Sequence, residues 1–210
     1  MVGLYATNAD LDGEVPFVGL TGGIGAGKST ALAALERLGA AVLSTDAVVH
    51  ELYDSPQLRE LLVSRWGRKV APDGVVDRAA VARSAFADDG ERRWLESVIW
   101  PRVGERMMEW RAEQQARTPR PAAAVVEVPL LFEASMDGVF DATIAIVADE
   151  QLRERRAAGR GHAAVAERTA AQLPQDEKAR RATYVVRNDG DEAELQSALA
   201  DVLAAIGSEA

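Results

Sequence analysis

The sequence predicts an α/β fold built on one doubly wound, five-stranded parallel sheet, and three observations predict it. Short apolar segments alternate with helical ones along the chain, as they do in βαβ units. These apolar segments are nearly continuous, which is typical of strands covered on both faces. At 210 residues, 48% hydrophobic and 27% charged, the chain also has the size and composition of one ordinary folded domain.

The expected elements follow one another in order after residues 1–15, which we expect to form a flexible extension. The five expected strands are Phe17–Thr21, Ala41–Leu43, Val125–Val128, Thr143–Val147 and Tyr184–Val186. A helix is expected over Thr30–Leu38, because its leucines share one face and Gly39 suits a helix end. The last helix begins at Asp191, three residues before Glu194, which is the spacing of a capping box.

Two long connections interrupt this alternation. About eighty residues of mostly helical character separate the second and third strands, too many for one crossover. We therefore expect a single domain over residues 16–206, with core segments 16–50, 122–149 and 176–206, a helical insert at about 51–121, a lid at about 150–175 and a tail at 207–210. All four tryptophans lie in the helical insert, where they either form the core of a small subdomain or line a pocket for a planar ligand.

Charge and composition narrow the function classes. The net charge of −9 disfavours general nucleic-acid binding, because a phosphate backbone would repel such a surface. The absence of cysteine and the presence of only two histidines disfavour disulfides, thiolate chemistry and a multi-histidine metal centre. No secretory signal begins the sequence and no apolar run approaches about 18 residues. We expect a cytoplasmic enzyme or binding protein, a monomer or weak oligomer, without a membrane or nucleic-acid partner.

A phosphate-binding motif follows the first expected strand. Residues 22–29 match Gly-x-x-x-x-Gly-Lys-Ser/Thr between a strand and a helix, which is the context of a P-loop. Its backbone N–H groups can surround phosphate oxygens, and its lysine can reach the β and γ phosphates. The alternative is an ordinary Gly-rich turn with an exposed lysine. The nucleotide-binding residues expected here are Gly22, Gly23, Ile24, Gly25, Ala26, Gly27, Lys28, Ser29 and Thr30.

Two carboxylates complete the expected chemistry. Ser29 is expected to ligate Mg²⁺, and Glu127, at the end of the third strand, is expected to act beside it through water, unless it pairs with a basic side chain. Asp46 follows the second strand at the edge where open α/β sheets bind ligands. We expect Asp46 to orient an acceptor hydroxyl and take its proton. The alternative is that it caps a helix over Ala47–Leu52.

The second insert carries a row of arginines. Arg153, Arg156 and Arg160 are spaced for one face of a helix, whereas Arg155 points elsewhere. Taken alone, the row is typical of a solvated face paired with glutamates. Beside a P-loop it predicts a lid that closes over nucleotide phosphates and neutralises charge in the transition state.

The pattern resembles the dephospho-coenzyme A kinases. The opening segment Phe17–Thr30 and the segment Val128-Pro129-Leu130-Leu131-Phe132-Glu133 carry this resemblance most specifically, and it extends from Val18 to about Leu203. Further matching positions are Asp46, Trp66-Gly67, Asp73-Gly74, Asp77-Arg78, Arg156, Arg160, Arg168, Gln172, Asn188 and Gly190. Positions that depart from the family pattern are Ser44, His50, Trp100 and Thr183.

The resemblance implies a P-loop kinase-type fold with a helical substrate-binding insert and a lid. It implies transfer of the ATP γ-phosphoryl group to the ribose 3′-hydroxyl of dephospho-coenzyme A, with Mg²⁺ as cofactor and Lys28, Asp46 and Arg156 as catalytic residues. Asn188 and Arg160 would join the nucleotide site. The substrate-binding residues it implies are Asp46, His50, Arg78, Pro129, Leu130 and Glu133.

Other function classes share parts of this pattern. A GTP-dependent switch is disfavoured, because Asn188-Asp189-Gly190-Asp191 lacks the lysine of a guanine-binding motif. A kinase for another acceptor, such as a nucleoside monophosphate, stays open. So does a non-catalytic nucleotide or coenzyme A sensor, whose altered acceptor site Ser44, His50 and Trp100 would mark.

Overall fold

The computed structural model describes residues 13–158 and 172–209, and its centre is a five-stranded sheet. All strands are parallel, and their order is β2-β3-β1-β4-β5. The strands are β1 (Phe17–Gly22), β2 (Ala41–Ser44), β3 (Ala124–Glu127), β4 (Ala142–Val147) and β5 (Tyr184–Arg187). The predicted α/β class and all five predicted strands are therefore confirmed, with ends shifted by a residue or so.

The strand order places the loops that follow β1, β2 and β3 at the same, carboxyl-terminal edge of the sheet. β1 pairs with β3 on one side and with β4 on the other. The strand order therefore reverses at β1, and this is the topological switch point of the sheet. Ligands bind at such a switch point in open α/β sheets. In register, Glu127 lies opposite Leu20 of β1 and Ser44 of β2, so the carboxyl ends of these three strands lie together.

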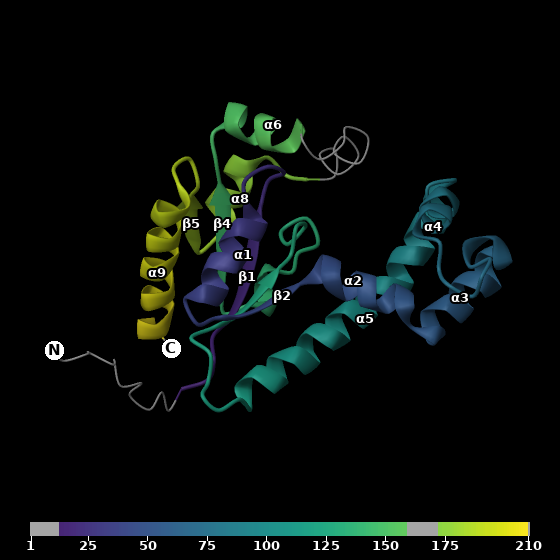
Figure 1. The fold of residues 1–210 in the computed structure, drawn as a ribbon, viewed down its shortest axis with the longest axis horizontal. Helices are drawn as coiled ribbons and strands as arrows, with labels where there is room; N and C mark the ends of the chain where they lie inside the picture. Colours follow the sequence, from purple (N-terminus) through teal and green to yellow (C-terminus); the bar gives the residue numbers. More distant parts are fainter. Residues whose placement is uncertain (1–12, 159–171, 210) are drawn as a thin grey trace.

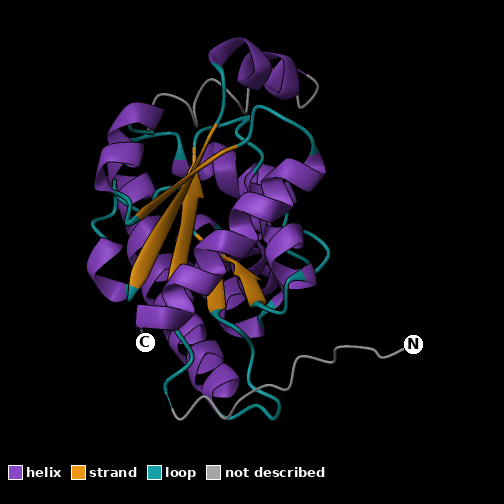
Figure 2. Cartoon of the chain, turned by 90° about the vertical axis from the view of Figure 1, so that its left-hand side faces the viewer, coloured by secondary structure: helices purple, strands orange, loops and turns teal. Residues whose placement is uncertain are grey.

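Helices cover both faces of the sheet, as Figure 2 shows. On one face, α1 (Lys28–Arg37) and α9 (Glu192–Glu209) pack against each other and against the strands. Gly39 ends the α1 turn with a φ of 93°, as its position predicts. Asp191 and Glu194 exchange the two hydrogen bonds of a capping box at the start of α9. This helix continues to Glu209, beyond the expected domain end at residue 206.

The other face of the sheet packs against the end of one long helix and a short one. The long helix is α5 (Asp89–Gln115), whose Met107 and Trp110 are buried with Phe17 and Val126 of the sheet. The short one is α8 (Gln175–Arg181), which contacts β1 and β4. Both faces of the strands are therefore apolar, which explains their continuous apolar sequence.

The helical insert extends away from the sheet in Figure 1. It comprises α2 (Thr45–Asp54), α3 (Pro56–Trp66), α4 (Arg78–Ala85) and the first part of α5. Polar side chains accept hydrogen bonds at three of its helix starts: Ser55, Asp77 and Asp88. Its apolar residues form a cluster of their own, centred on Val48, Leu58, Leu62, Val81 and Val103.

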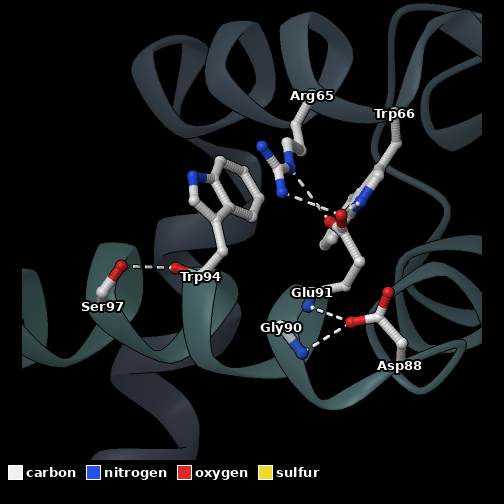
Figure 3. Close-up of polar contacts among 7 residues, drawn as sticks. All are labelled: Arg65, Trp66, Asp88, Gly90, Glu91, Trp94 and Ser97. Atoms are coloured by element: carbon white, nitrogen blue, oxygen red, sulfur yellow. Dashed lines mark hydrogen bonds and ion pairs between the residues drawn. The ribbon is translucent and has the colours of Figure 1, made fainter.

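The four tryptophans do not share one environment. Trp66 and Trp94 pack in the insert with their rings edge to face, 5.0 Å apart, and Glu91 accepts a 2.7 Å hydrogen bond from the Trp66 indole (Figure 3). Trp66 also lines a hollow of about 370 Å³ in the insert. The expectation that all four tryptophans form the core of the helical insert is wrong for Trp100 and Trp110. Trp110 lies on the part of α5 that reaches the sheet, and Trp100 is 44% exposed.

Candidate active site

The phosphate loop connects β1 to α1. Two of its glycines, Gly25 and Gly27, have φ values of 77° and 94°, in the left-handed region that favours glycine. A side chain at Gly25 would collide with the backbone carbonyl of Arg153, and one at Gly27 with the Asn188 amide. Both positions therefore require glycine for space as well as for conformation.

Lys28 is the first residue of α1 and folds back over this loop. Its ammonium group donates hydrogen bonds to the carbonyl oxygens of Gly22 at 2.9 Å and Gly23 at 3.2 Å. No acidic residue lies in the first turn of α1, and Ser29 and Thr30 are exposed there. The positive end of the α1 dipole and the Lys28 ammonium group therefore lie at the same loop, which suits an anion such as phosphate.

Asn188 lies behind the loop, directly after β5. Its side-chain amide is buried and donates a 2.8 Å hydrogen bond to the Ala26 carbonyl. Its own carbonyl accepts a 3.1 Å hydrogen bond from Arg156. Asn188 therefore contacts both the phosphate loop, through Ala26, and Arg156.

Helix α6 (Glu150–Ala158) brings two arginines to the loop. The Arg153 guanidinium lies so close to Gly23 that a Cβ atom added there would be 2.6 Å from it. Its Nε is buried and has no hydrogen-bond partner within the described residues. Arg156 reaches Asn188, whereas Arg155 donates back to Gln151 of its own helix. The predicted facing of Arg153 and Arg156 agrees with these contacts. Arg160 and Arg168 lie outside the described residues.

A polar contact fixes the start of α6. The Asp189 carboxylate accepts a 2.6 Å hydrogen bond from the backbone N–H of Asp149, one residue before the helix. This hydrogen bond lowers the pKa of Asp189, and the Arg187 side chain lowers it further. The turn after β5 therefore contacts the start of α6 as well as the phosphate loop.

Asp46 lies in the first turn of α2, at the neighbouring strand end. The helix begins at Thr45 with Ser44 as its N-cap residue, so the alternative of Asp46 as the cap of a helix beginning at Ala47 is wrong. The physical reason is a long-range hydrogen bond from the Thr45 hydroxyl to the Glu127 carbonyl, at 3.0 Å, which starts the helix earlier. Asp46 is exposed, and its side chain is free of the capping role.

The metal-binding candidates are Ser29 and Glu127. Among the described residues, no group of three or more His, Cys, Asp or Glu side chains could hold a metal ion by itself. This donor set fits Mg²⁺, which typically takes one or two protein oxygens and completes its shell with water and substrate phosphates.

The remaining expected acceptor residues lie on three different elements. His50 is exposed on α2, one turn after Asp46, and its Nδ1 lies 2.9 Å from the Asp46 carbonyl oxygen. Arg78 begins α4 in the insert, with its guanidinium 5.9 Å from the centre of the Tyr53 ring. Burial raises the pKa of Tyr53, and the Arg78 charge partly offsets this. Among the described residues, Arg78 makes no hydrogen bond or ion pair to the phosphate loop, and its contact is with Tyr53.

Pro129, Leu130 and Glu133 lie on the segment after β3. A buried lysine that the sequence analysis did not predict contacts this segment. Lys178 of α8 is fully buried; it donates to the Pro129 carbonyl at 2.7 Å and pairs with Glu133 at 3.0 Å. Burial lowers the pKa of Lys178, and Glu133 raises it in part. Four charged neighbours, Asp176, Glu177, Arg180 and Arg181, make the sequence of α8 typical of a solvated helix, so no sequence pattern marks this lysine.

Comparisons with known proteins agree on one family. The family model described as dephospho-CoA kinase matches residues 16–194. A dephospho-CoA kinase from Moorella thermoacetica is 39% identical over 90% of this chain and 89% of its own length. Another, from Symbiobacterium thermophilum, is 40% identical over 82% of this chain and 74% of its own length.

Solved structures agree with the fold described above. A crystal structure from Thermus thermophilus has a TM-score of 0.77 at 34% identity, over 92% of this chain and 98% of that one. A dephospho-CoA kinase structure from Campylobacter jejuni has a TM-score of 0.62 over 91% of this chain and 97% of that one; at 20% identity it supports the fold alone. Because the family model covers residues 16–194 and the Moorella relative is 39% identical over 90% of this chain, this chain belongs to the dephospho-CoA kinase family.

Proposed function

We propose that the phosphate loop, the α6 arginines and Asp46 together transfer the ATP γ-phosphoryl group to the ribose 3′-hydroxyl of dephospho-coenzyme A. The chain is a phosphotransferase of the family that completes coenzyme A biosynthesis, and ATP and dephospho-coenzyme A are the two substrates proposed for it. The observation that carries the proposal is the meeting of Lys28, the α6 arginines and the strand ends at one sheet edge.

On the nucleotide side, the loop amides would bind the ATP phosphates and Lys28 would neutralise the β and γ phosphates. Arg156 lies one hydrogen bond from the Asn188 that supports the loop, and so it can reach charge that develops during transfer. Arg160 is proposed to join it. Asn188 is proposed to shape the nucleotide site through Ala26.

On the acceptor side, Asp46 would accept the proton of the attacking hydroxyl. It is exposed at the carboxyl end of β2, beside the end of β3, and no capping bond occupies its side chain. An in-line attack needs the acceptor held near the γ phosphorus with a base within reach of its proton. His50, Arg78, Pro129 and Leu130 are proposed to bind the rest of the acceptor, and Glu133 to act from behind them.

Ser29 and Glu127 are the residues proposed to hold Mg²⁺, with Glu127 acting through water. When bound, the ion would supply charge neutralisation between the β and γ phosphates. Ser29 is exposed at the first turn of α1, and Glu127 ends the strand next to β1. Their small number is consistent with an ion that retains most of its waters.

No helix within the described residues is long and apolar enough to cross a bilayer. We propose a cytoplasmic location, because the reaction consumes ATP. A monomer or weak oligomer stays our prediction for the oligomeric state, and size-exclusion chromatography at two protein concentrations would test it.

ADP release with a panel of acceptors tests the proposed function. Dephospho-coenzyme A should support turnover, and adenosine monophosphate should not. Turnover with a nucleoside monophosphate alone would overturn the proposed acceptor. Binding of ATP and dephospho-coenzyme A without ADP release would instead make the chain a sensor.

A further inference from the structure

A buried ion pair lies behind the acceptor-side segment. Lys178 of α8 is fully buried, and its ammonium group lies 3.0 Å from a Glu133 carboxylate oxygen whose side chain is 14% exposed. The same ammonium donates to the Pro129 carbonyl at 2.7 Å and reaches the Thr21 hydroxyl of β1 at 3.5 Å. One lysine therefore touches the central strand and the segment that follows β3.

Glu133 extends this connection to the segment that precedes α8. Its oxygen Oε1 accepts a 2.7 Å hydrogen bond from the backbone N–H of Leu173, two residues before that helix. Its other oxygen, Oε2, is buried and finds no hydrogen-bond partner within the described residues. The pair thus joins three segments that are far apart in sequence: β1, residues 129–133 and the chain at Leu173.

Such a pair is a costly way to stabilise a fold. Two charges lose water when they are buried, and apolar residues of similar volume often stabilise a site as well or better. The unpartnered Oε2 adds to that cost. What the charges supply, and apolar packing does not, is a fixed direction for the Pro129 carbonyl and the Leu173 amide.

We propose that Glu133 and Lys178 are a positioning pair that holds the acceptor-binding segment in register with β1, which leads into the phosphate loop, and with the segment at Leu173. The proposal rests on the acceptor role proposed above for Pro129 and Leu130. Glu133 then acts through the backbone of that segment instead of contacting the substrate. Lys178 would orient the Pro129 carbonyl, a role that the charged residues around it in the sequence do not indicate.

Matched variants separate positioning from plain stability. Lys178→Met leaves Glu133 buried and unpaired, so this variant should have a lowered Tm. Adding Glu133→Gln removes that unpaired charge, so the double variant should recover its Tm to within about 3 °C of the wild type. The control is Glu177→Gln with Arg180→Met, which removes an exposed ion pair from the same helix.

Kinetics of the double variant decide between the two roles. We expect its KM for dephospho-coenzyme A to rise about tenfold or more and its kcat to fall, because a misplacement of about 1 Å can cost about 10²-fold. Its KM for ATP should stay within about threefold, because the phosphate loop is held by other contacts. The control variant should match the wild type in all three constants.

A double variant with recovered Tm and wild-type kinetics would overturn the proposal and leave the pair a structural one. If the double variant does not fold, Glu133→Gln alone decides, since it retains the shape of the side chain. A KM for dephospho-coenzyme A raised about threefold or more at an unchanged Tm supports positioning, and an unchanged KM overturns it. Failure of the proposed function would look different, because the wild type itself would then release no ADP with dephospho-coenzyme A.

Discussion

At the scale of single residues, Lys28 lies over its own loop. Its ammonium group donates hydrogen bonds to two carbonyl oxygens of that loop, Gly22 and Gly23. We expect the same ammonium group to bind a phosphate oxygen from this place without a large rearrangement of its side chain. Little side-chain entropy then has to be lost when the nucleotide binds.

Lys28→Ala should abolish transfer and leave the fold intact, because Lys28 is only partly buried and its ammonium group contacts loop carbonyls. We expect an unchanged Tm without nucleotide and loss of the ATP-induced rise in Tm. Thermal unfolding with and without ATP measures both, with Lys69→Ala of the insert as the control. A full ATP-induced shift in Lys28→Ala would rule out the phosphate site described here.

Asp46→Asn tests the base. Because Asp46 lies within the first turn of α2 and is not its cap, loss of its charge should cost only about 0.3–1 kcal/mol through the helix dipole. Turnover should fall by about 10²–10⁴-fold, the usual contribution of a general base, with ATP affinity within about threefold. Steady-state kinetics and ATP binding measure these effects.

Asp54→Asn, at the other end of α2, is the matched control and should turn over normally. Near-normal turnover of Asp46→Asn would remove Asp46 from the catalytic residues. A comparable loss in Asp54→Asn would point instead to a general effect on α2.

At the scale of elements, α6 separates its arginines by direction. Arg153 and Arg156 face the phosphate loop, whereas Arg155 bonds to its own helix. The contact between Asp149 and Asp189 holds the start of the helix in this rotation. Substitution of Arg156 can therefore be compared with substitution of Arg155, which lies on the other face of the same helix.

Arg156→Ala should lower kcat by about 10³-fold or more, as for an arginine that stabilises transferring phosphoryl charge in cis. Its effect on binding of the acceptor alone should be small. Arg155→Ala, one residue away with the same charge, should have near wild-type kcat. Equal losses in the two variants would contradict the facing of α6 described here.

Glu91 joins α3 to α5 through Arg65 and Trp66 (Figure 3). The hydrogen bond from Arg65 and then that from Trp66 lower the pKa of Glu91 below its ordinary value of 4.5. A lowered pKa in the folded state means that this stabilisation is complete above pH 4.5 and is lost as the pH falls through the folded-state pKa.

The Tm difference between wild type and Glu91→Gln should therefore be largest near neutral pH and disappear in acid. Thermal unfolding from pH 7 to pH 3 measures it, with the exposed Glu96→Gln as the control. A difference that is independent of pH would show that the Glu91 charge contributes nothing to the joint between α3 and α5.

The sequence predicts those elements whose causes are local. Strand positions follow from continuous apolar runs, the phosphate loop from its motif, and the end of α1 from Gly39. The start of α2 at Thr45 could not be predicted, because its hydrogen bond to the Glu127 carbonyl spans 82 positions in the chain. Burial of Lys178 depends likewise on Glu133 and Pro129, which lie 45 and 49 residues away by number.

At the scale of the whole molecule, the same sheet edge that forms the site also holds the fold together. Strands β1, β2 and β3 end there, and the α6 and β5 segments contact the loop from the other side. A ligand bound at this edge would contact segments that are far apart in the chain. Its binding energy should therefore add to global stability.

ATP with Mg²⁺ at about 100 times its Kd should stabilise the protein by about 2.7 kcal/mol. For a chain of this size that corresponds to a Tm rise of roughly 5–10 °C. Removing the metal with EDTA should reduce the rise, and Glu127→Gln should weaken its dependence on Mg²⁺ concentration. A Tm rise that is the same with EDTA would exclude the metal roles proposed for Ser29 and Glu127.

The strand order also sets when the protein can fold during its synthesis. β3 lies between β1 and β2 in the sheet, yet the ribosome makes it last of the three. At roughly 5–20 residues per second, the intervening insert delays it by several seconds. Throughout that time β1 and β2 lack β3, the strand that pairs with both of them. Their apolar segments are then exposed to pairing with other chains, which is a route to aggregation. Only when residue 127 leaves the ribosome can the edge that binds phosphate take shape.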